Sequence, residues 1–467
     1  MAPGSNATRA ASPGAWTAPQ IWLFAGFSAL QLLLIFTHAP WFDEMHGLLI
    51  ARAPFSQLAA NLKYEGHPAL WYLWLGTVDR VLGASPWSLP VAEAPISIGI
   101  LALIWFAAPL PRRVKLLLSL SYFFVLEYGV ISRSYSLGVL LLLGAVPLRR
   151  SLWGWVLLAL AANTAAHVLL VAAALGAVFF MEQRQWKGPA ILMLGCAAAV
   201  ATIYPVAHDL YPTDGAPSGL LATRVAIAFT QLAAALTPAP LVLPFRWQAP
   251  PLTLSAVLIG LLGLPIGLSA IKGLWPRLIF AGLYLALLLM ATFAYGLSPR
   301  HAGMTFIFFV TMLWMHCERG EALPKAAWIW LGATVLAGLP FIATAEVQPF
   351  AYSRAVAAWI QQHGLQRELW GAWPGRQGAL ISAELGRPSL NLEKDCLNTF
   401  VRWNYPHEKV RDPMLHIDRT GVRYVISERP LPQGQRIAWF AKAAGWGPAV
   451  GLYRFRGSPG PSAPICK

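Results

Sequence analysis

Apolar residues gather in long runs along most of the chain, and short polar gaps separate these runs. Such runs are typical of helices in lipid, which need about 20 apolar residues to cross a bilayer. Several runs are shorter, so their ends are set only to within a few residues. We predict eleven membrane-spanning helices, over residues 21–36, 90–110, 114–127, 135–148, 152–164, 166–181, 189–206, 252–271, 278–297, 302–316 and 326–344.

The first run has the apolar character of a signal-peptide core. Its one basic neighbour, Arg9, is distant, and His38-Ala39-Pro40 makes a poor cleavage site. We therefore interpret residues 21–36 as an uncleaved membrane helix.

Two further apolar segments, 67–83 and 222–243, are ambiguous. The first contains Asp79 and Arg80, and the second is interrupted by prolines. If the N-terminus is cytoplasmic and neither segment crosses, every basic cluster between the runs falls on the cytoplasmic side, as the positive-inside rule requires. We predict that both are in-plane juxtamembrane helices and that the C-terminus is exported. The basic clusters are Arg112/Arg113/Lys115, Arg149/Arg150, Arg184/Lys187, Lys272/Arg277 and Arg319/Lys325.

The same pattern divides the first three quarters of the chain into two regions. Residues 1–19 are rich in Ala, Pro, Gly and Ser, which predicts a flexible N-terminus. Residues 20–345 form the predicted membrane domain, with a first outer loop at 38–89 and another at 207–251. The Pro and Gly content of the second loop favours a flexible region that faces an acceptor.

From residue 346 to 467 the composition becomes mixed and charged. Val422–Ile426 alternates as a strand does, and 351–363 has the pattern of a helix. We predict a small soluble α/β domain on the outer side. Cys396 and Cys466 both lie in it, and a disulfide between them and two unpaired thiols are both compatible with the sequence.

Composition supports lipid as the main solvent. The chain is 57% hydrophobic and 12% charged, whereas a soluble domain is roughly 25% charged. These values exclude a cytosolic enzyme, a disordered chain and a secreted disulfide scaffold. The net charge of +15 is explained by membrane lipids as partners, with no nucleic acid required. The four cysteines show no CxxC pair, which argues against structural zinc.

The first outer loop carries the strongest signal for chemistry. Asp43 and Glu44 follow the first helix directly, and Lys63, Glu65 and His67 follow later in the loop. Ionisable groups at the lipid–water boundary are costly unless they find partners or serve a site. A carboxylate here can remove a proton from a hydroxyl or ligate a divalent cation. The alternative is an ordinary hydrated loop, in which such charges cost little.

Two arginines on the same predicted side complete the candidate site. Arg133 lies between Glu127 and Tyr135 in one outer turn, and Arg300 precedes His301 in another. The guanidinium group offers a planar fork of donors that suits a phosphate. Outer-face arginines are not explained by the positive-inside rule, although each alone is also compatible with snorkelling at the interface.

Other polar residues are interpreted as structural. His167 is predicted to be a core histidine, and Glu93 to pair with Arg80. No Gly-rich phosphate loop with a following Lys and Ser or Thr is present, so nothing supports transport driven by ATP.

These motifs together resemble the GT-C superfamily of integral membrane glycosyltransferases, most closely protein O-mannosyltransferases and the lipid A aminoarabinose transferase. The matching pieces are Phe42-Asp43-Glu44, Gly66-His67-Pro68-Ala69-Leu70-Trp71-Tyr72, Ser132-Arg133-Ser134-Tyr135-Ser136-Leu137 and Arg300-His301. The likeness in layout covers roughly residues 20–345. Where the family has a second proline in His-Pro-Pro, this chain has Ala69.

The resemblance implies a polytopic α-helical membrane enzyme with in-plane helices in its first outer loop, in a bacterial inner membrane, with a periplasmic C-terminal domain. Such enzymes move a sugar from a polyprenyl-phosphate donor to an acceptor, here a lipid, glycan or protein, and usually invert the anomeric centre. The acidic residue in the first outer loop is their base, which maps to Asp43.

Roles for the other residues follow from the chemistry of that reaction. Glu44 would orient Asp43 or act in its place, while Arg300, His301 and Arg133 would hold the donor phosphate. The remaining candidates, Lys63, Glu65, His67, Glu127 and Tyr135, would line the donor or acceptor side.

The metal question stays open at this stage. Asp43, Glu127 and His67, with Glu44 and Glu65 nearby in sequence, offer enough ligands for Mg²⁺ or Mn²⁺. Because the arginines already serve the phosphate, we favour a metal-independent reaction.

Three other functions compete with a GT-C transferase. A lipid-linked sugar flippase or other transporter predicts mid-span polar residues and internal repeats, and no clear repeat is seen. An O-antigen ligase or polymerase of another fold relies on a large Arg-rich outer loop and a catalytic histidine, which the Asp43-Glu44 pair fits poorly. A non-enzymatic scaffold would leave the acid–base cluster unexplained.

Overall fold

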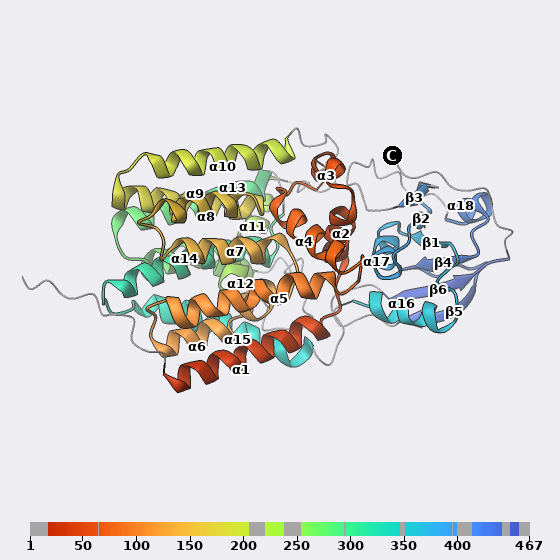
Figure 1. The fold of residues 1–467 in the computed structure, drawn as a ribbon, viewed down its shortest axis with the longest axis horizontal. Helices are drawn as coiled ribbons and strands as arrows, with labels where there is room; N and C mark the ends of the chain where they lie inside the picture. Colours follow the sequence, from red (N-terminus) through yellow and green to blue (C-terminus); the bar gives the residue numbers. More distant parts are fainter. Residues whose placement is uncertain are drawn as a thin grey trace, which may run out of the picture.

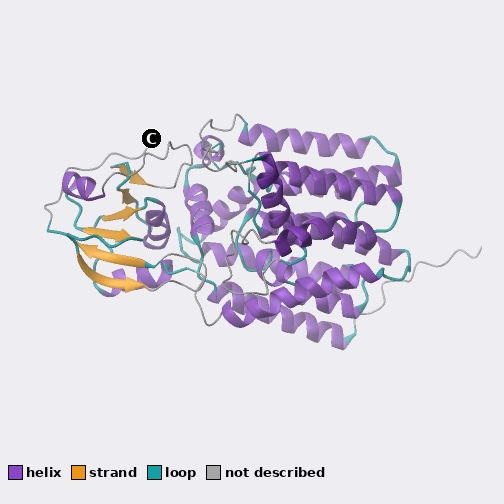
Figure 2. Ribbon diagram, turned by 180° about the vertical axis from the view of Figure 1, so that it is seen from behind, coloured by secondary structure: helices purple, strands orange, loops and turns teal. Residues whose placement is uncertain are grey.

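The computed structural model describes residues 17–63, 65–204, 220–237, 254–293, 296–345, 351–394, 396–398, 413–440 and 449–456. In this part of the chain the protein is mostly helical, and a small sheet domain follows the helices (Figure 1). The strands lie at one end of the molecule and the long helices at the other (Figure 2). Residues 1–16, 207–219, 238–251 and Cys466, for which the sequence makes predictions, lie outside the described residues.

The helical domain follows the apolar runs of the sequence. Each predicted run contains helical residues, because a run of apolar side chains with no helix breaker satisfies its backbone internally and buries its surface against neighbouring helices. The helices are α1 (Ala18–Thr37), α2 (Phe42–Arg52), α3 (Phe55–Leu62), α4 (Leu70–Val81), α5 (Ser88–Ala102), η1 (Leu103–Ala107), α6 (Arg112–Leu120), η2 (Phe123–Glu127), α7 (Ser134–Ala145), α8 (Leu152–Ala162), α9 (Ala166–Gln183), α10 (Lys187–Ile203), α11 (Leu221–Leu232), η3 (Ala233–Ala235), α12 (Leu254–Ala270), α13 (Leu274–Phe293), α14 (Pro299–Glu318) and α15 (Lys325–Ala345).

Four helices in the described part of the chain are long and apolar enough to cross a membrane. They span Ala18–Thr37, Ser88–Ala107, Ala166–Gln183 and Leu274–Phe293. By length and composition these four helices are compatible with a membrane protein. The total of eleven spans and the orientation of the chain stay predictions.

The two ambiguous segments form short helices. Helix α4 has 12 residues, which span about 18 Å, well short of a ~30 Å hydrocarbon layer. Its Trp71, Tyr72 and Leu75 are fully buried, and Figure 1 shows α2, α3 and α4 together at the end of the bundle that faces the sheet domain. Helix α11 also has 12 residues. Their in-plane placement stays a prediction.

Helix α14 lies at the centre of the helical domain. All of its residues from Pro299 to His316 are buried, which is typical of a helix surrounded by other helices. Close approach requires a small residue at position 303, where an added Cβ would lie 2.2 Å from Phe123 Cε1 and 2.6 Å from the Tyr128 hydroxyl. Gly303 therefore fixes how α14 packs against η2.

Substituting Gly303 with alanine is expected to destabilise the protein. Overpacking of this kind costs about 1–3 kcal/mol, more than the ~1 kcal/mol that alanine gains over glycine in a helix. Thermal unfolding in detergent measures the effect, and Gly332→Ala in α15 is the matched control because an added Cβ there meets nothing within 4 Å. A G303A variant that is as stable as G332A would contradict this packing.

The described residues of the C-terminal domain contain a six-stranded sheet with helices, which agrees with the predicted α/β class. The strand order is β3-β2-β1-β4-β6-β5, with β2, β1 and β4 parallel and the other pairs antiparallel. The predicted strand and helix are confirmed as β4 and α16, and Cys396 is disulfide-bonded. The elements are α16 (Ser353–Gln362), β1 (Trp370–Trp373), α17 (Arg376–Leu385), β2 (Ser389–Asn391), β3 (Cys396–Asn398), α18 (Pro413–Thr420), β4 (Tyr424–Ser427), β5 (Gln435–Phe440) and β6 (Val450–Arg454).

The sheet domain docks on the first loop of the helical domain. Arg52 of α2 donates a 2.9 Å hydrogen bond to the Ala383 carbonyl in α17, and Ser353 Oγ donates one of 3.2 Å to the Pro40 carbonyl. Arg52 also pairs with buried Asp79 at 3.1 Å. These contacts hold the loop that begins at residue 38 between the two domains.

One sequence prediction about this region is wrong. Glu93 does not pair with Arg80: it accepts a 2.8 Å hydrogen bond from Ser136 Oγ. Arg80 instead donates to the carbonyls of Gly76 and Ala53, both at 2.7 Å. The guanidinium lies beside the carbonyl of Ala53 at the end of α2, an acceptor that the helix leaves open, and beside the carbonyl of Gly76 within α4.

Candidate functional site

The two carboxylates of the first loop lie in the first turn of α2. Trp41, in an extended conformation, precedes the helix, so Asp43 and Glu44 occupy its second and third positions. Negative charge is stabilised there by the exposed N–H groups of the first turn. The positions place the two side chains in different environments.

Glu44 is fully engaged with the protein. It is 1% exposed, its Oε1 accepts a 2.8 Å bond from the Ser132 N–H, and its Oε2 accepts one of 3.0 Å from the Trp41 N–H. His38 Nε2 also lies 2.8 Å from Oε2. Glu44 therefore joins the start of α2 to the end of α1 and to the turn before α7.

Asp43 is the more accessible carboxylate. Its Oδ2 accepts a 2.8 Å hydrogen bond from Arg300 Nη2, and its side chain is 20% exposed. No described residue donates a hydrogen bond to its Oδ1. Arg133 Nη1 donates to the Asp43 carbonyl at 2.6 Å. Both predicted arginines therefore meet the predicted base, and one carboxylate oxygen stays available.

Arg300 is held in place by the start of α14. The helix follows extended Ser298 with Pro299 at its first position, an arrangement favoured at helix N-termini. The Arg300 carbonyl accepts a 2.7 Å bond from the Tyr128 hydroxyl, and the guanidinium lies 5.2 Å from the Trp41 ring. These contacts fix a guanidinium whose side chain is 7% exposed.

Glu65 forms the other side of the cluster. Its carboxylate lies 3.6 Å from Arg133 Nη2 and 3.2 Å from His46 Nδ1, and it accepts a 2.8 Å bond from the Tyr72 hydroxyl. Burial alone would raise the pKa of Glu65, but His46, Arg133 and His67 together hold that pKa well below its usual value. Glu65 is therefore an anion at neutral pH that fixes Arg133.

A chain of rings connects His67 to the interior. The Tyr135 hydroxyl lies 2.8 Å from His301 Nε2 and 3.5 Å from His67 Nε2, and His301 stacks on His167 with 4.0 Å between ring centroids. His301 Nδ1 accepts the Ser298 N–H at 3.0 Å, so the proton of a neutral His301 lies on Nε2 and points to Tyr135. His167, interpreted from sequence as a core histidine, is part of this chain.

The pKa of His67 falls to about 4 because burial disfavours its charged form, and Arg133 and Arg300 add to the effect while Glu65 opposes it. His67 is therefore neutral near pH 7. Neutral imidazole can accept or donate a hydrogen bond to a sugar or acceptor hydroxyl without adding charge to the site.

Two predicted site residues lie apart from this cluster. Glu127 is buried and accepts a 2.8 Å bond from the Tyr122 hydroxyl; its neighbour Tyr128 makes the contact with Arg300. Lys63 follows α3, and no hydrogen bond or ion pair between described residues connects it to the cluster.

The predicted metal ligands are not brought together. Asp43 is held by Arg300, His67 by Tyr135 and Glu127 by Tyr122. Within the described ranges, no group of three or more His, Cys, Asp or Glu side chains could hold a metal ion. Metal dependence of the reaction stays a prediction.

Three residues of the site were not singled out from the sequence. His46 and Tyr72 hold Glu65, and Tyr128 holds Arg300. His46 lies three residues after Asp43, and Tyr72 follows His67 in a short motif. Proximity in sequence was therefore the one signal that could have identified them. Tyr128 carried only its adjacency to Glu127.

Comparison of the chain with protein-family models, curated proteins and solved structures finds no match. The site is therefore interpreted from its own geometry.

Glu44→Gln tests whether the second carboxylate is structural. An amide cannot accept at both of its polar atoms, so one of the N–H groups of Trp41 and Ser132 would lose its acceptor, at a cost of about 1–3 kcal/mol. We expect a clear drop in melting temperature, larger than that of Asp43→Asn. A Glu44→Gln protein with unchanged stability and no activity would instead identify Glu44 as the base.

Proposed function

We propose that the protein is a membrane glycosyltransferase that moves a sugar from a polyprenyl-phosphate donor to a hydroxyl of a lipid, glycan or protein acceptor. The observation that best supports this proposal is the 2.8 Å contact between Arg300 Nη2 and Asp43 Oδ2, in which the Asp43 side chain stays 20% exposed. The proposed base and the proposed phosphate-binding arginine are thereby close enough to contact the same substrate molecule.

The reaction assigned to this site is a single displacement. Asp43 takes the proton of the acceptor hydroxyl as its oxygen attacks the anomeric carbon of the donor, and the bond from that carbon to the phosphate oxygen breaks. Polyprenyl phosphate leaves with one more negative charge, which Arg300 offsets. Asp43 then gives its proton to water. Attack from the side opposite the phosphate inverts the anomeric centre.

Unsatisfied donors support a phosphate in this place. Arg133 Nε and Ser134 Oγ are buried, and neither has a hydrogen-bond partner among the described residues. A buried donor without an acceptor costs about 1–3 kcal/mol, which an anion bound beside them would relieve. Arg300 makes its own contribution once the phosphate competes with Asp43 for its guanidinium.

The helix ends add to this preference for an anion. Asp43, Tyr135, His167 and Arg300 lie in the first turns of α2, α7, α9 and α14, and their mutual contacts bring those turns together. Helix N-termini carry partial positive charge and exposed N–H groups, which favour bound phosphate.

The outer face of a bacterial inner membrane is part of the proposal. Cys396 in the C-terminal domain is disulfide-bonded, and disulfides are typical of oxidising, extracytoplasmic compartments. That domain docks on the loop that carries Asp43, so the two belong to the same side. We infer a cytoplasmic N-terminus and eleven spans from the distribution of basic clusters.

We also propose that the transfer needs no divalent cation, because the charge of the leaving phosphate is met by Arg300 and Arg133. Activity that disappears in EDTA and returns with Mg²⁺ or Mn²⁺ would contradict this part of the proposal.

The test is an assay of purified protein with a panel of polyprenyl-phosphate sugars. A transferase releases free polyprenyl phosphate and labels an acceptor. In proteoliposomes a flippase would move the intact donor across the bilayer without release, and a scaffold would do neither. Transport of intact donor without any release would overturn the proposal.

A further inference from the structure

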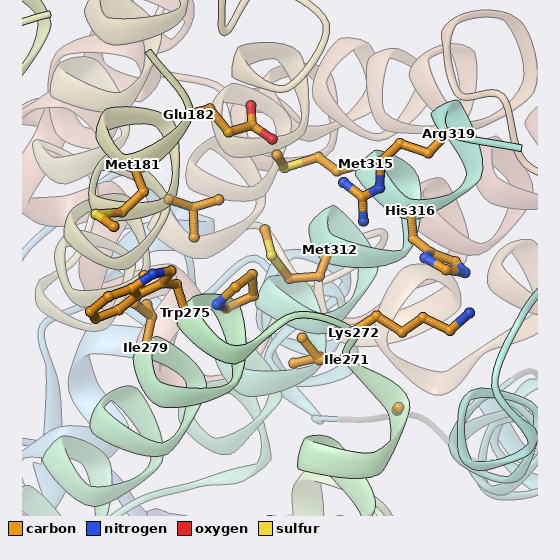
Figure 3. Close-up of a pocket in the computed structure, with 13 residues that line it drawn as sticks. Met181, Glu182, Ile271, Lys272, Trp275, Ile279, Met312, Met315, His316 and Arg319 are labelled. Atoms are coloured by element: carbon orange, nitrogen blue, oxygen red, sulfur yellow. The ribbon is translucent and has the colours of Figure 1, made fainter. Parts of the chain in front are cut away.

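A second candidate site lies at the opposite end of α14. A cavity of about 220 Å³ opens between the ends of α9 and α14 and the connection from α12 to α13 (Figure 3). His316 in this cavity follows Arg300 by sixteen residues on one helix, a separation of about 24 Å. The cavity is therefore separate from the Asp43 cluster. Its lining residues are Val178, Met181, Glu182, Ala270, Ile271, Lys272, Trp275, Pro276, Ile279, Met312, Met315, His316 and Arg319.

The lining has an apolar side and a cationic side, and it also includes the carboxylate of Glu182, which pairs with Arg149 at 3.2 Å. Figure 3 shows Met181, Trp275 and Ile279 on one side, and Lys272, His316 and Arg319 on the other. Trp275 is 55% exposed, although tryptophan usually buries most of its surface or lies at a membrane interface. A ligand that fits both sides has an apolar part next to an anionic part.

The cationic side already holds an anion from the protein itself. Glu321, on the exposed connection to α15, lies 3.4 Å from Lys272 Nζ, 3.0 Å from Arg319 Nε and 3.2 Å from His316 Nδ1. Hydrogen bonds from Arg319 and Lys272, with the charge of His316, lower the pKa of Glu321 below its usual value. Two nitrogen donors, Lys272 Nζ and Arg319 Nε, thus converge on one position that suits the oxygen atoms of an anion. His316 Nε2 donates to the Ala322 carbonyl, so its Nδ1 adds a third donor there when the ring is protonated.

We propose that this cavity binds the anionic headgroup of a phospholipid from the leaflet opposite the Asp43 cluster. The lipid phosphate takes the position that the Glu321 carboxylate now occupies, and the first part of an acyl chain lies against Met181, Trp275 and Ile279. The volume is below the ~300–1,000 Å³ of pockets that enclose a whole small ligand, so the rest of the chain runs along the outside of the bundle. This inference depends on the membrane location and not on the transfer reaction.

Because Glu321 and the lipid phosphate compete for the same cations, the proposal predicts opposite changes in lipid affinity for two variants. Glu321→Ala removes the competing carboxylate and should tighten lipid binding. The double variant Lys272→Ala/Arg319→Ala removes both permanent cations and should weaken it about tenfold or more, since each basic residue near a surface contributes roughly 1 kcal/mol to binding an anionic lipid. These side chains are exposed, so the variants are expected to fold.

The control variant loses the same two positive charges at a position away from the cavity. Arg112→Ala/Arg113→Ala removes two exposed arginines from the start of α6, which does not line the cavity, on the same predicted side of the membrane. It should leave binding unchanged.

Native mass spectrometry of the full-length protein in detergent measures binding. Phosphatidylglycerol and phosphatidylcholine with equal chains are added separately, and inorganic phosphate is added as a competitor. We expect one phosphatidylglycerol to be retained in preference to phosphatidylcholine, with no displacement by inorganic phosphate at equal concentration. Equal retention of the two lipids, displacement by free phosphate, weaker binding by Glu321→Ala, or an equal loss in the Arg112/Arg113 control would each overturn the proposal.

Discussion

Replacing Asp43 with asparagine is expected to lower sugar transfer by a factor on the order of 10²–10⁴, the usual contribution of a general base. Asparagine keeps an oxygen that can accept the hydrogen bond of Arg300, now 2.8 Å from the Asp43 carboxylate, so the local geometry should persist. It cannot take a proton from the acceptor hydroxyl. The measurement is release of polyprenyl phosphate per enzyme under saturating donor.

Stability is the control for this variant. The ion pair is mostly buried, with 7% of the Arg300 side chain and 20% of the Asp43 side chain accessible, but asparagine keeps an acceptor for the hydrogen bond from Arg300 and so limits the loss of stability. The melting temperature of Asp43→Asn should therefore stay close to that of the wild type. Near-normal turnover by a folded Asp43→Asn protein would reject Asp43 as the base.

Replacing Arg300 with glutamine is expected to lower transfer by roughly 10²–10³, the effect of removing one donor that stabilises developing negative charge. The side chain is 7% exposed and is fixed by Asp43 and the Trp41 ring. Glutamine offers neither the charge nor the planar fork. Turnover and inhibition by free polyprenyl phosphate are both measured.

The binding of the product separates a phosphate ligand from a mere partner of Asp43. Arg300→Gln should weaken inhibition by polyprenyl phosphate, whereas Asp43→Asn should leave it unchanged or strengthen it, because a competing carboxylate becomes neutral. If both variants bind the product as the wild type does, Arg300 does not hold the phosphate.

The helices were predictable from sequence because a segment in lipid must satisfy its backbone hydrogen bonds internally. An apolar run such as 166–181 forms a helix, here α9 (Ala166–Gln183), because no other conformation satisfies its backbone in an apolar surrounding. Segment 67–83, which the sequence left ambiguous, forms a helix of 12 residues with Asp79 and Arg80 near its end, and its in-plane placement stays a prediction.

The contact between Asp43 and Arg300 was anticipated from the predicted side of the membrane on which each residue lies, and not from any estimate of the distance between them. Basic residues on the predicted outer face lacked a topological explanation, and the two that drew attention, Arg133 and Arg300, both contact Asp43. Counting spans indicates on which side a residue lies, and a small helical bundle then leaves few places where such side chains can be buried without meeting.

The partners of individual carboxylates could not be predicted. Glu44 caps its own helix through the N–H of Trp41, a residue that is not a typical cap, so no capping signature was visible. Glu93 accepts a hydrogen bond from Ser136, and Glu127 accepts one from Tyr122. Which partner each carboxylate meets depends on how the neighbouring helices are rotated about their axes. Sequence spacing carries no information on that rotation.

The most direct test of the central claim, that Asp43 acts as the base on the acceptor, is chemical rescue with azide. Azide attacks the anomeric carbon without giving up a proton, so it needs no base, and the products are a glycosyl azide and polyprenyl phosphate. In purified Asp43→Ala protein we expect almost no transfer to a hydroxyl acceptor but renewed release of polyprenyl phosphate when azide is added, and a glycosyl azide of inverted configuration. If Asp43→Ala still binds the donor and azide restores no release, Asp43 is not the base.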